Sequence, residues 1–181
     1  MADKRSGYRV VGFEYILMGT VPGQAATASN YMPTGASLNT IGNLVPDSAH
    51  LLIDPETVND FYVEEKAEVD CQIKTPGKKT IEFATRDMGP DMLAFFLGGA
   101  ASGTTVYKAP QTASVVSEKS VRILTKAING YTYMIEIPRA SISVGGDLRF
   151  GKAETGTLTV SAAIMQPYSS CAPFKMTLTS A

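Results

Sequence analysis

Acidic residues crowd one stretch of the chain, and paired carboxylates are the first chemistry that this pattern suggests. The stretch is DFYVEEKAEVDCQIKTPGKKTIEFATRD, residues 60–87. In an extended strand Glu64, Glu68 and Asp70 would share one face, as the acid pair of a β-sandwich glycosidase does. However, Lys66 lies between these acids, and the chain has no Trp to form the aromatic platform of a sugar cleft. We therefore expect a polar wall here instead of a catalytic pair.

Metal binding and nucleophilic catalysis need residue types that this chain hardly supplies. The single histidine is His50, and the two cysteines are Cys71 and Cys171. One histidine without a neighbouring nucleophile does not form a triad, and three scattered ligands do not form a zinc site. No loop has the Asp/Asn-Gly rhythm of a calcium site, and the segment GGAASGTT, residues 98–105, lacks the lysine of a phosphate loop. We expect no enzyme activity, no metal and no cofactor.

The bulk composition describes a globular chain with no affinity for polyanions. The chain has 181 residues, 44% of them hydrophobic and 18% charged, with a net charge of −1. This length suits one domain over residues 1–181, and the charge gives no basic surface with which to grip nucleic acid. The polar start MADKRSGYRV is unlike a secretory signal, and no apolar run approaches the roughly 20 residues of a membrane span. We expect a protein without membrane contact, either cytoplasmic or carried in a particle.

The elements that must position the acids are β-strands. Alternating apolar residues predict a strand over residues 8–18, a short one at 50–54, and a hairpin that contains the acids. We expect a loop at Pro76-Gly77-Lys78 that places Ile73 opposite Ile81 and Cys71 opposite Phe83. One face of that hairpin would then be dry, with Cys71 buried, and the other would carry Glu64, Lys66, Glu68 and Asp70.

One segment is predicted to be helical. In GPDMLAFFLGG, residues 89–99, Pro90 suits the first turn, Asp91 complements the helix dipole, and the paired glycines end the helix. We expect a helix over residues 89–97. Its apolar residues spread over more of the circumference than one sheet contact needs. The helix is therefore either deeply buried or in contact with another subunit, and Phe95 and Phe96 are the residues we assign to such a contact.

The last third of the chain is predicted to be strands joined by tight turns. Asn129-Gly130 is a strong hairpin signal and would place Leu124 opposite Ile135. A three-residue loop at 145–147 would pair Val144 with Leu148, and two alternating strands follow at 155–165 and 172–180. We expect eight to ten strands and one flanking helix in an antiparallel β-sandwich or barrel.

Residues 19–48 form a Gly-, Ser- and Pro-rich segment that is too long for an idle loop. We expect it to be an extended loop or arm that docks on a neighbouring subunit through its apolar residues. Open sheet edges leave backbone groups unpaired, and a ring of copies would pair them. The residues assigned to this contact are Tyr31, Met32, Leu38 and Ile41.

Together these features resemble the major tail proteins, or tail tube proteins, of tailed bacteriophages. The likeness extends from about residue 8 to 166. It is carried by the long early loop, the hairpin VEEKAEVDCQIKTPGKKTIEF, the helix GPDMLAFFLGG and the late strands YMIEIPRASISVGGDLRFGKAETGTLTVSAAIMQP.

The resemblance implies a structural protein of the virion tail, assembled in the host cytoplasm. It implies rings, usually hexamers, that stack into a tube, and partners such as tape-measure, terminator and baseplate or tip proteins. DNA would pass without specific binding, along a lumen wall to which we assign Glu64, Lys66, Glu68 and Asp70. The alternatives are an ordinary solvated outer face for these four residues and, for the whole chain, a capsid decoration or adhesion β-sandwich module.

Overall fold

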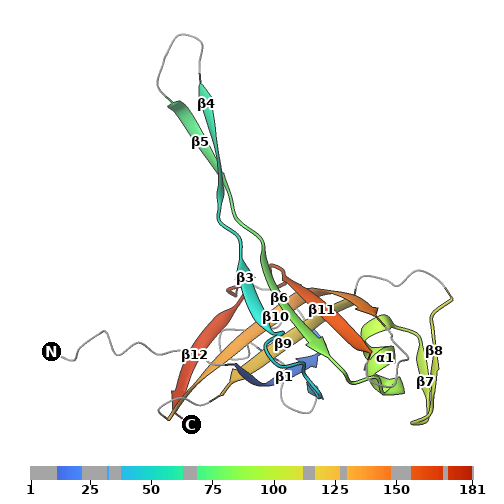
Figure 1. Cartoon of the computed structure of the whole chain (residues 1–181). Coiled ribbons are helices and arrows are strands. Elements are labelled where there is room, and N and C mark those ends of the chain that lie inside the picture. The colour runs from blue at the N-terminus through green and yellow to red at the C-terminus, as the bar shows by residue number, and fades with distance from the viewer. Residues whose placement is uncertain are drawn as a thin grey trace.

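The expected fold class is confirmed. The computed structural model describes residues 12–21, 32, 38–62, 69–111, 117–126, 130–147, 156–168 and 171–180. Within them the chain is mainly β, its strands pair antiparallel, and α1 (Pro90–Leu97) is the one helix. Figure 1 shows a curled sheet with α1 at one end and a two-stranded hairpin that projects away from the body.

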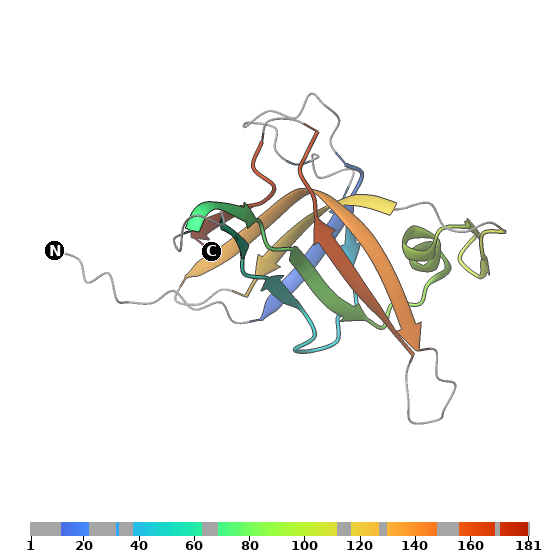
Figure 2. The same ribbon diagram turned by 90° about the horizontal axis from the view of Figure 1, so that it is seen from above.

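Eight strands form the main sheet, in the order β2-β1-β9-β10-β11-β6-β3, with β12 also paired to β10. The sheet curls around its own core without closing, because the path ends at β2 and β3 (Figure 2). The strands of this sheet are β1 (Phe13–Gly19), β2 (Leu38–Ile41), β3 (His50–Ile53), β6 (Lys79–Thr85), β9 (Ser117–Thr125), β10 (Tyr131–Asp147), β11 (Thr157–Ile164) and β12 (Lys175–Ser180).

A proline in β10 accompanies the curl. The first half of β10 pairs with β12 and the second half with β11, while β9 pairs along both halves. The ladder with β9 shifts register between Ile137 and Ala140, and the fully buried Pro138 lies within this shift. Proline cannot donate to a ladder, so an interior strand tolerates it at a bulge, where the strand also bends.

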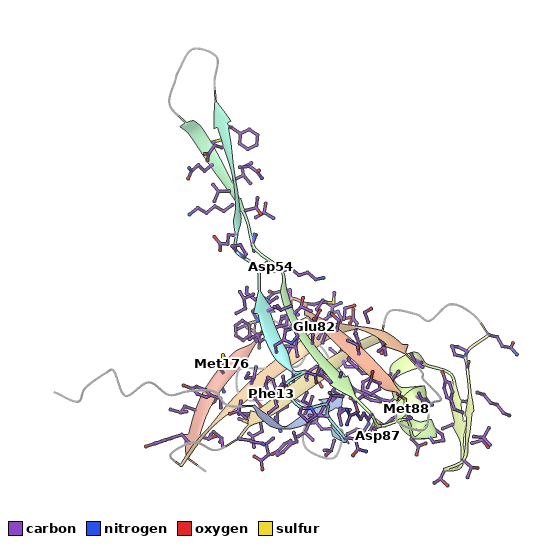
Figure 3. All side chains as sticks on the ribbon, in the orientation of Figure 1. Phe13, Asp54, Glu82, Asp87, Met88 and Met176 are labelled. Atoms are coloured by element: carbon purple, nitrogen blue, oxygen red, sulfur yellow. The ribbon has the colours of Figure 1, made fainter. Side chains whose placement is uncertain are left out.

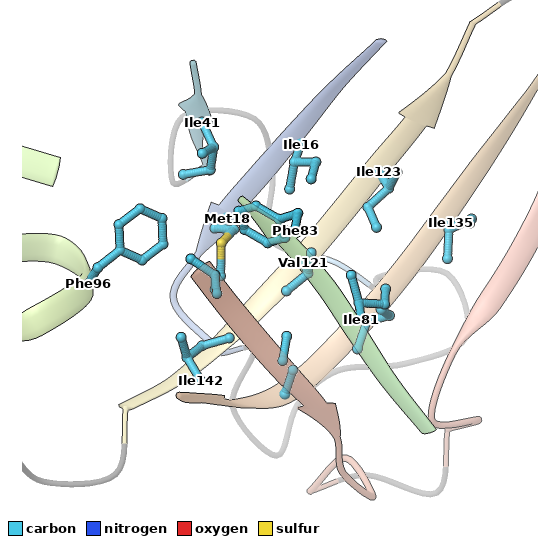
Figure 4. Packing of buried hydrophobic residues seen from close by; sticks show 14 of the residues in the cluster. Ile16, Met18, Ile41, Ile81, Phe83, Phe96, Val121, Ile123, Ile135 and Ile142 are labelled. Atoms are coloured by element: carbon cyan, nitrogen blue, oxygen red, sulfur yellow. The ribbon is translucent and has the colours of Figure 1, made fainter. Parts of the chain in front are cut away.

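The core lies on the inner face of the curled sheet, and α1 closes one end of it (Figure 4). Phe83 and Phe96 are its buried aromatic residues, and the ring of Phe95 meets Phe96 edge to face at 5.4 Å. The helix begins at Pro90 and gives way to Gly98, whose φ of 76° favours glycine. The core is otherwise built from aliphatic residues at alternate strand positions: Ile16, Met18, Ile41, Ile81, Val121, Ile123, Ile135, Ile137, Ala140, Ile142, Leu158, Val160 and Ala162.

Two expected turns of the last third differ from the structure. The loop at residues 145–147 is wrong, because β10 continues through Asp147 and Val144 pairs with Val160. A Cβ atom at Gly146 would lie 2.8 Å from Leu158, so this glycine permits close strand approach. β9 and β10 pair antiparallel as expected, but their register places Leu124 opposite Met134 and not Ile135, and Asn129 lies outside the described residues.

The early segment is more structured than expected. Residues 38–41 form β2, which pairs with β1, and Leu44 bridges to Thr85. The backbone N–H of Val45 also donates to the carbonyl of Ala84 at 2.8 Å. The end of this segment is therefore part of the body, and residues 22–31 and 33–37, on which the predicted arm also falls, lie outside the described residues.

The projecting hairpin is β4 (Thr57–Tyr62) paired with β5 (Val69–Thr75). The predicted pairing of β5 with β6 is wrong: Ile73 lies opposite Asn59 and Cys71 opposite Phe61. β6 pairs instead with β3 and β11, so Ile81 lies opposite Leu51 and Ala162. A small hairpin of β7 (Ala100–Ser102) and β8 (Val106–Lys108) contacts α1.

Candidate interaction surface on the projecting hairpin

We call β4 and β5 the arm, and residues 54–56 and 76–78 the joint that connects it to the body. The ladder of β3 with β6 ends at Ile53 opposite Lys79, and the arm ladder begins four residues further along each strand, at Thr57 opposite Thr75. The register is therefore the same on both sides of the joint. The arm and the β3–β6 pair form one long hairpin that is interrupted at Pro76-Gly77-Lys78, where a turn was expected.

The ladder is interrupted at the joint by residues that cannot complete it. Pro55 and Pro76 have no backbone N–H to donate. Asp54 keeps one bond, because its N–H donates to the carbonyl of Lys78 at 2.9 Å. Gly77 lies so close to Asp54 that a Cβ atom would collide with the Asp54 carbonyl group. The strands thus remain in contact at the joint while their ladder is broken. Figure 3 places Asp54 where the arm leaves the body.

The two faces of the arm differ in charge. Side chains alternate along each strand, and the register places directly opposed residues on the same face. One face, which we call the uncharged face, carries Phe61 and Ile73 among small polar residues and Cys71. The other, which we call the charged face, includes Asp60 and Lys74. The uncharged face consists of Thr57, Asn59, Phe61, Cys71, Ile73 and Thr75, and the charged face includes Val58, Asp60, Gln72 and Lys74.

The uncharged face is exposed in the single chain. Phe61 is 49% exposed and Ile73 54%, and Cys71 is also exposed. The alternation predicted a dry face here, and the predicted parity of Cys71 and Ile73 is correct. The predicted burial of Cys71 is wrong, because Cys71 is exposed in a two-stranded sheet whose strands pair only with each other. A face of the expected chemistry is therefore present without the layer that was expected to bury it.

The same register links this face to the core. In β3 and β6 the residues of the same parity, Leu51, Ile81 and Phe83, point toward the core, and Ile81 and Phe83 are fully buried. Because the register is the same on both sides of the joint, the uncharged face of the arm extends the core face of the sheet beyond the body. Ile53, the last such residue before the joint, is already 56% exposed.

A second apolar surface is open on β12. Met176 lies opposite Ile135 and Leu178 opposite Tyr133. Because Ile135 belongs to the core, Met176 and Leu178 project from the core side of the sheet, yet they are 46% and 37% exposed. Tyr131, at the same end of β10 and on the same face, is also exposed. We call Tyr131, Met176 and Leu178 the β12 patch.

The predicted site residues fall in different places. Glu64, Lys66 and Glu68 lie outside the described residues, as does Tyr31, and Asp70 lies in β5 two residues before Gln72. Met32, Ile41 and Phe96 are buried within the single chain, so their side chains have no surface left for a second copy and we do not assign them to a contact. Leu38 and Phe95 are partly buried, and the ammonium of Lys119 lies 4.4 Å from the Phe95 ring centroid.

The best-defined polar cluster joins Arg139, Glu118 and Tyr168. The Arg139 guanidinium donates two hydrogen bonds to the Glu118 carboxylate, at 2.6 and 2.9 Å, and lies 3.9 Å from the Tyr168 ring centroid. The Tyr168 hydroxyl donates to Glu118 at 2.9 Å. These bonds to Arg139 lower the pKa of Glu118, and the bond to Glu118 raises the pKa of Tyr168. A paired carboxylate of this kind is stabilised in its charged form and is a poor general base.

The other ion pairs among the described residues also join neighbouring strands. Arg122 donates to the buried Glu136 at 2.8 Å, and His50 Nε2 lies 3.3 Å from Glu82. Among the described residues, no group of three or more His, Cys, Asp or Glu side chains is placed to hold a metal ion. The surfaces that stand out are therefore the apolar ones.

No protein-family model matches this sequence, and no curated protein is significantly similar to it. In the part of the chain that the structure describes, none of the helical segments is long and apolar enough to cross a membrane.

Proposed function

We propose that this protein is a structural subunit that assembles with copies of itself into stacked rings, and that these rings form a phage tail tube through which DNA passes. The single observation that carries the proposal is the uncharged face of the arm. It extends the core face of the sheet in register, and its large residues Phe61 and Ile73 are about half exposed. Removing apolar surface of this kind from water lowers the free energy by about 25 cal/mol per Å².

The sheet edges support assembly further. β2, β3 and β12 each have one strand partner among the described strands, so each has an edge without a ladder. Such edges are prone to pair with another chain, and ordered pairing between copies is one way to cover them. The arm and the β12 patch are different surfaces of one chain. Contact between different surfaces is heterologous, and heterologous contacts generate rings or helical stacks.

The lumen assignment follows from the charges of the arm. Asp70 lies in β5, Glu64, Lys66 and Glu68 lie in the sequence between β4 and β5, and the chain carries a net charge of −1. A wall with interspersed acids and no basic excess does not hold a polyanion, so DNA slides along it. We propose these residues as part of the inner wall, with tape-measure, terminator and baseplate or tip proteins as partners of the assembled tube in the virion tail.

A capsid decoration or adhesion module is the second candidate. The observation that favours it is the arm itself, since a projecting hairpin can also insert into an unrelated protein. Such a module would stay monomeric or trimeric on its own, whereas a tube subunit forms rings or tubes without a partner.

The experiment compares two exposed β-branched residues on opposite faces of the arm. Ile73→Ser removes a side chain from the uncharged face, and Val58→Ser removes one of similar exposure (45%) from the charged face. We expect rings or tubes in negative-stain micrographs of the wild type and Val58→Ser, and single copies of Ile73→Ser in sedimentation velocity. A wild type that stays a compact monomer at high concentration contradicts the proposal.

A further inference from the structure

The arm points in a direction along which a second copy would stack on the first. In Figure 1 the arm stands above β12, and in Figure 2, which looks along the arm, the two overlap. Both views thus place the arm and β12 on one side of the body, displaced along the arm direction. A second copy translated along this direction brings its β12 toward the arm of the first.

The two surfaces match in size and chemistry. β4 and β12 are each six residues long. The arm offers Phe61 and Ile73, and the β12 patch offers Tyr131, Met176 and Leu178. Stacked sheets pack through such side chains about 10 Å apart, and a thioether against an aromatic ring is favourable.

Neither surface would bury a charge. Asp60 of β4 and Lys74 of β5 lie on the opposite face from Ile73. Lys175 lies opposite Glu136 and hence on the other face of β12 from Met176. Contact between the two surfaces therefore avoids the desolvation penalty that a buried charge brings.

Other exposed apolar residues are poorer candidates. The ring of Tyr168 is occupied by Arg139 and its hydroxyl by Glu118. Leu52 lies on β3 opposite Thr80, on the face away from the core, and Val106 lies on the small β7–β8 hairpin. The β12 patch groups three exposed large residues on one face that continues the core.

We propose that the uncharged face of the arm of one copy packs on the β12 patch of the next copy. This contact rests on the proposed self-assembly and specifies how successive copies meet. Within one chain both surfaces are exposed, so the contact forms between copies. It builds a short two-layer sandwich in which the arm is the second layer over β10 and β12.

The test uses Cys71, the natural thiol of the uncharged face. In a Cys171→Ser background, Met176→Cys adds a thiol to the β12 patch, and the neighbouring Lys175→Cys adds one to the opposite face as the matched control. Disulfides form where Cβ atoms come within about 4.5 Å of each other. On oxidation of the assembled protein, we expect Met176→Cys to give a ladder of covalent oligomers, since each copy carries both thiols, and Lys175→Cys to give none.

Charge exchange provides a second test that needs no oxidation. Ile73→Lys alone and Leu178→Glu alone each weaken assembly by about tenfold or more in critical concentration, and the two together restore it, because opposite charges across an interface attract. Both positions are exposed, so neither variant disturbs folding. Rings or tubes that form without the Met176→Cys ladder and without this rescue overturn the arm-to-β12 contact but leave self-assembly standing. A wild type that never assembles overturns both.

Discussion

Gly77 lies against the carbonyl group of Asp54 at the point where the arm leaves the body. This contact lets two strands stay close across an interruption without a change of register. The direction of the arm depends on it, because the flanking prolines remove the N–H groups that would otherwise fix the strands to each other.

Gly77→Ala is expected to turn the arm while the body stays folded. The new Cβ atom collides with the Asp54 backbone, so the strands at the joint must separate. Spin labels on Cys71 and Cys171 report the distance between arm and body, measured in the Ile73→Ser background to keep the chain dissociated. We expect a changed and broader distance distribution. Gly145→Ala is the control, since a Cβ atom there meets nothing within 4 Å. An unchanged distribution for Gly77→Ala would contradict the role of this contact.

Aromatic residues of the arm and of the core are expected to differ sharply in their effect on stability. Phe83→Ala in the core should lower the free energy of unfolding by about 3–5 kcal/mol, because it removes a fully buried ring. Phe61→Ala on the arm should lower it by less than about 1 kcal/mol. Urea unfolding of the dissociated chain measures both. Equal losses would mean that Phe61 is already covered within one copy.

The pair of Arg139 with Glu118 should make stability depend on pH. Since its pKa is lowered in the folded chain, Glu118 contributes stability fully above its ordinary value of 4.5, and this contribution is lost as the pH falls through the folded-state value. Glu118→Gln should therefore be less stable than the wild type at pH 7, and the difference should shrink on acidification. Thermal unfolding from pH 7 to 3 measures this, with Glu14→Gln as the control. A difference that is constant with pH would contradict the assignment.

The lumen assignment predicts an effect on DNA transit. Glu68→Lys combined with Asp70→Lys places cations where we assign the inner wall, so DNA should leave particles that carry both changes more slowly, and more so at low salt. The rate of DNA ejection measures this. Glu68→Asp with Asp70→Glu keeps the charge and serves as control. Normal ejection from the lysine-bearing tubes would refute a lumen position.

Local patterns predicted the elements well because they depend on neighbouring residues. Alternation predicted that Cys71 and Ile73 share a face, and Pro90 with Gly98 predicted the helix limits. Pairing partners could not be predicted in the same way. Pro76-Gly77 suits a turn as well as an interrupted ladder, and only the distant residues 50–62 decide between the two.

The candidate site shows the same limit. Ile41 and Phe96 are apolar in sequence whether they fill the core of their own chain or face another, and the structure places both in their own core. The exposure of the β12 patch could not be predicted from the sequence, because an alternating strand such as 175–180 predicts a covered face. Its exposure depends on which strands lie across from it, and no local residue pattern encodes that.

Alkylation of Cys71 tests most directly whether a second copy covers the uncharged face of the arm. With Cys171→Ser as background, Cys71 is the single thiol of the chain and is exposed in one copy. The rate of its reaction with a maleimide is compared between dissociated and assembled protein at the same pH. We predict that rings or tubes form, and that Cys71 in them reacts at most about one tenth as fast as in the dissociated protein. Equal rates in both states, or a protein that remains dissociated at high concentration, would contradict it.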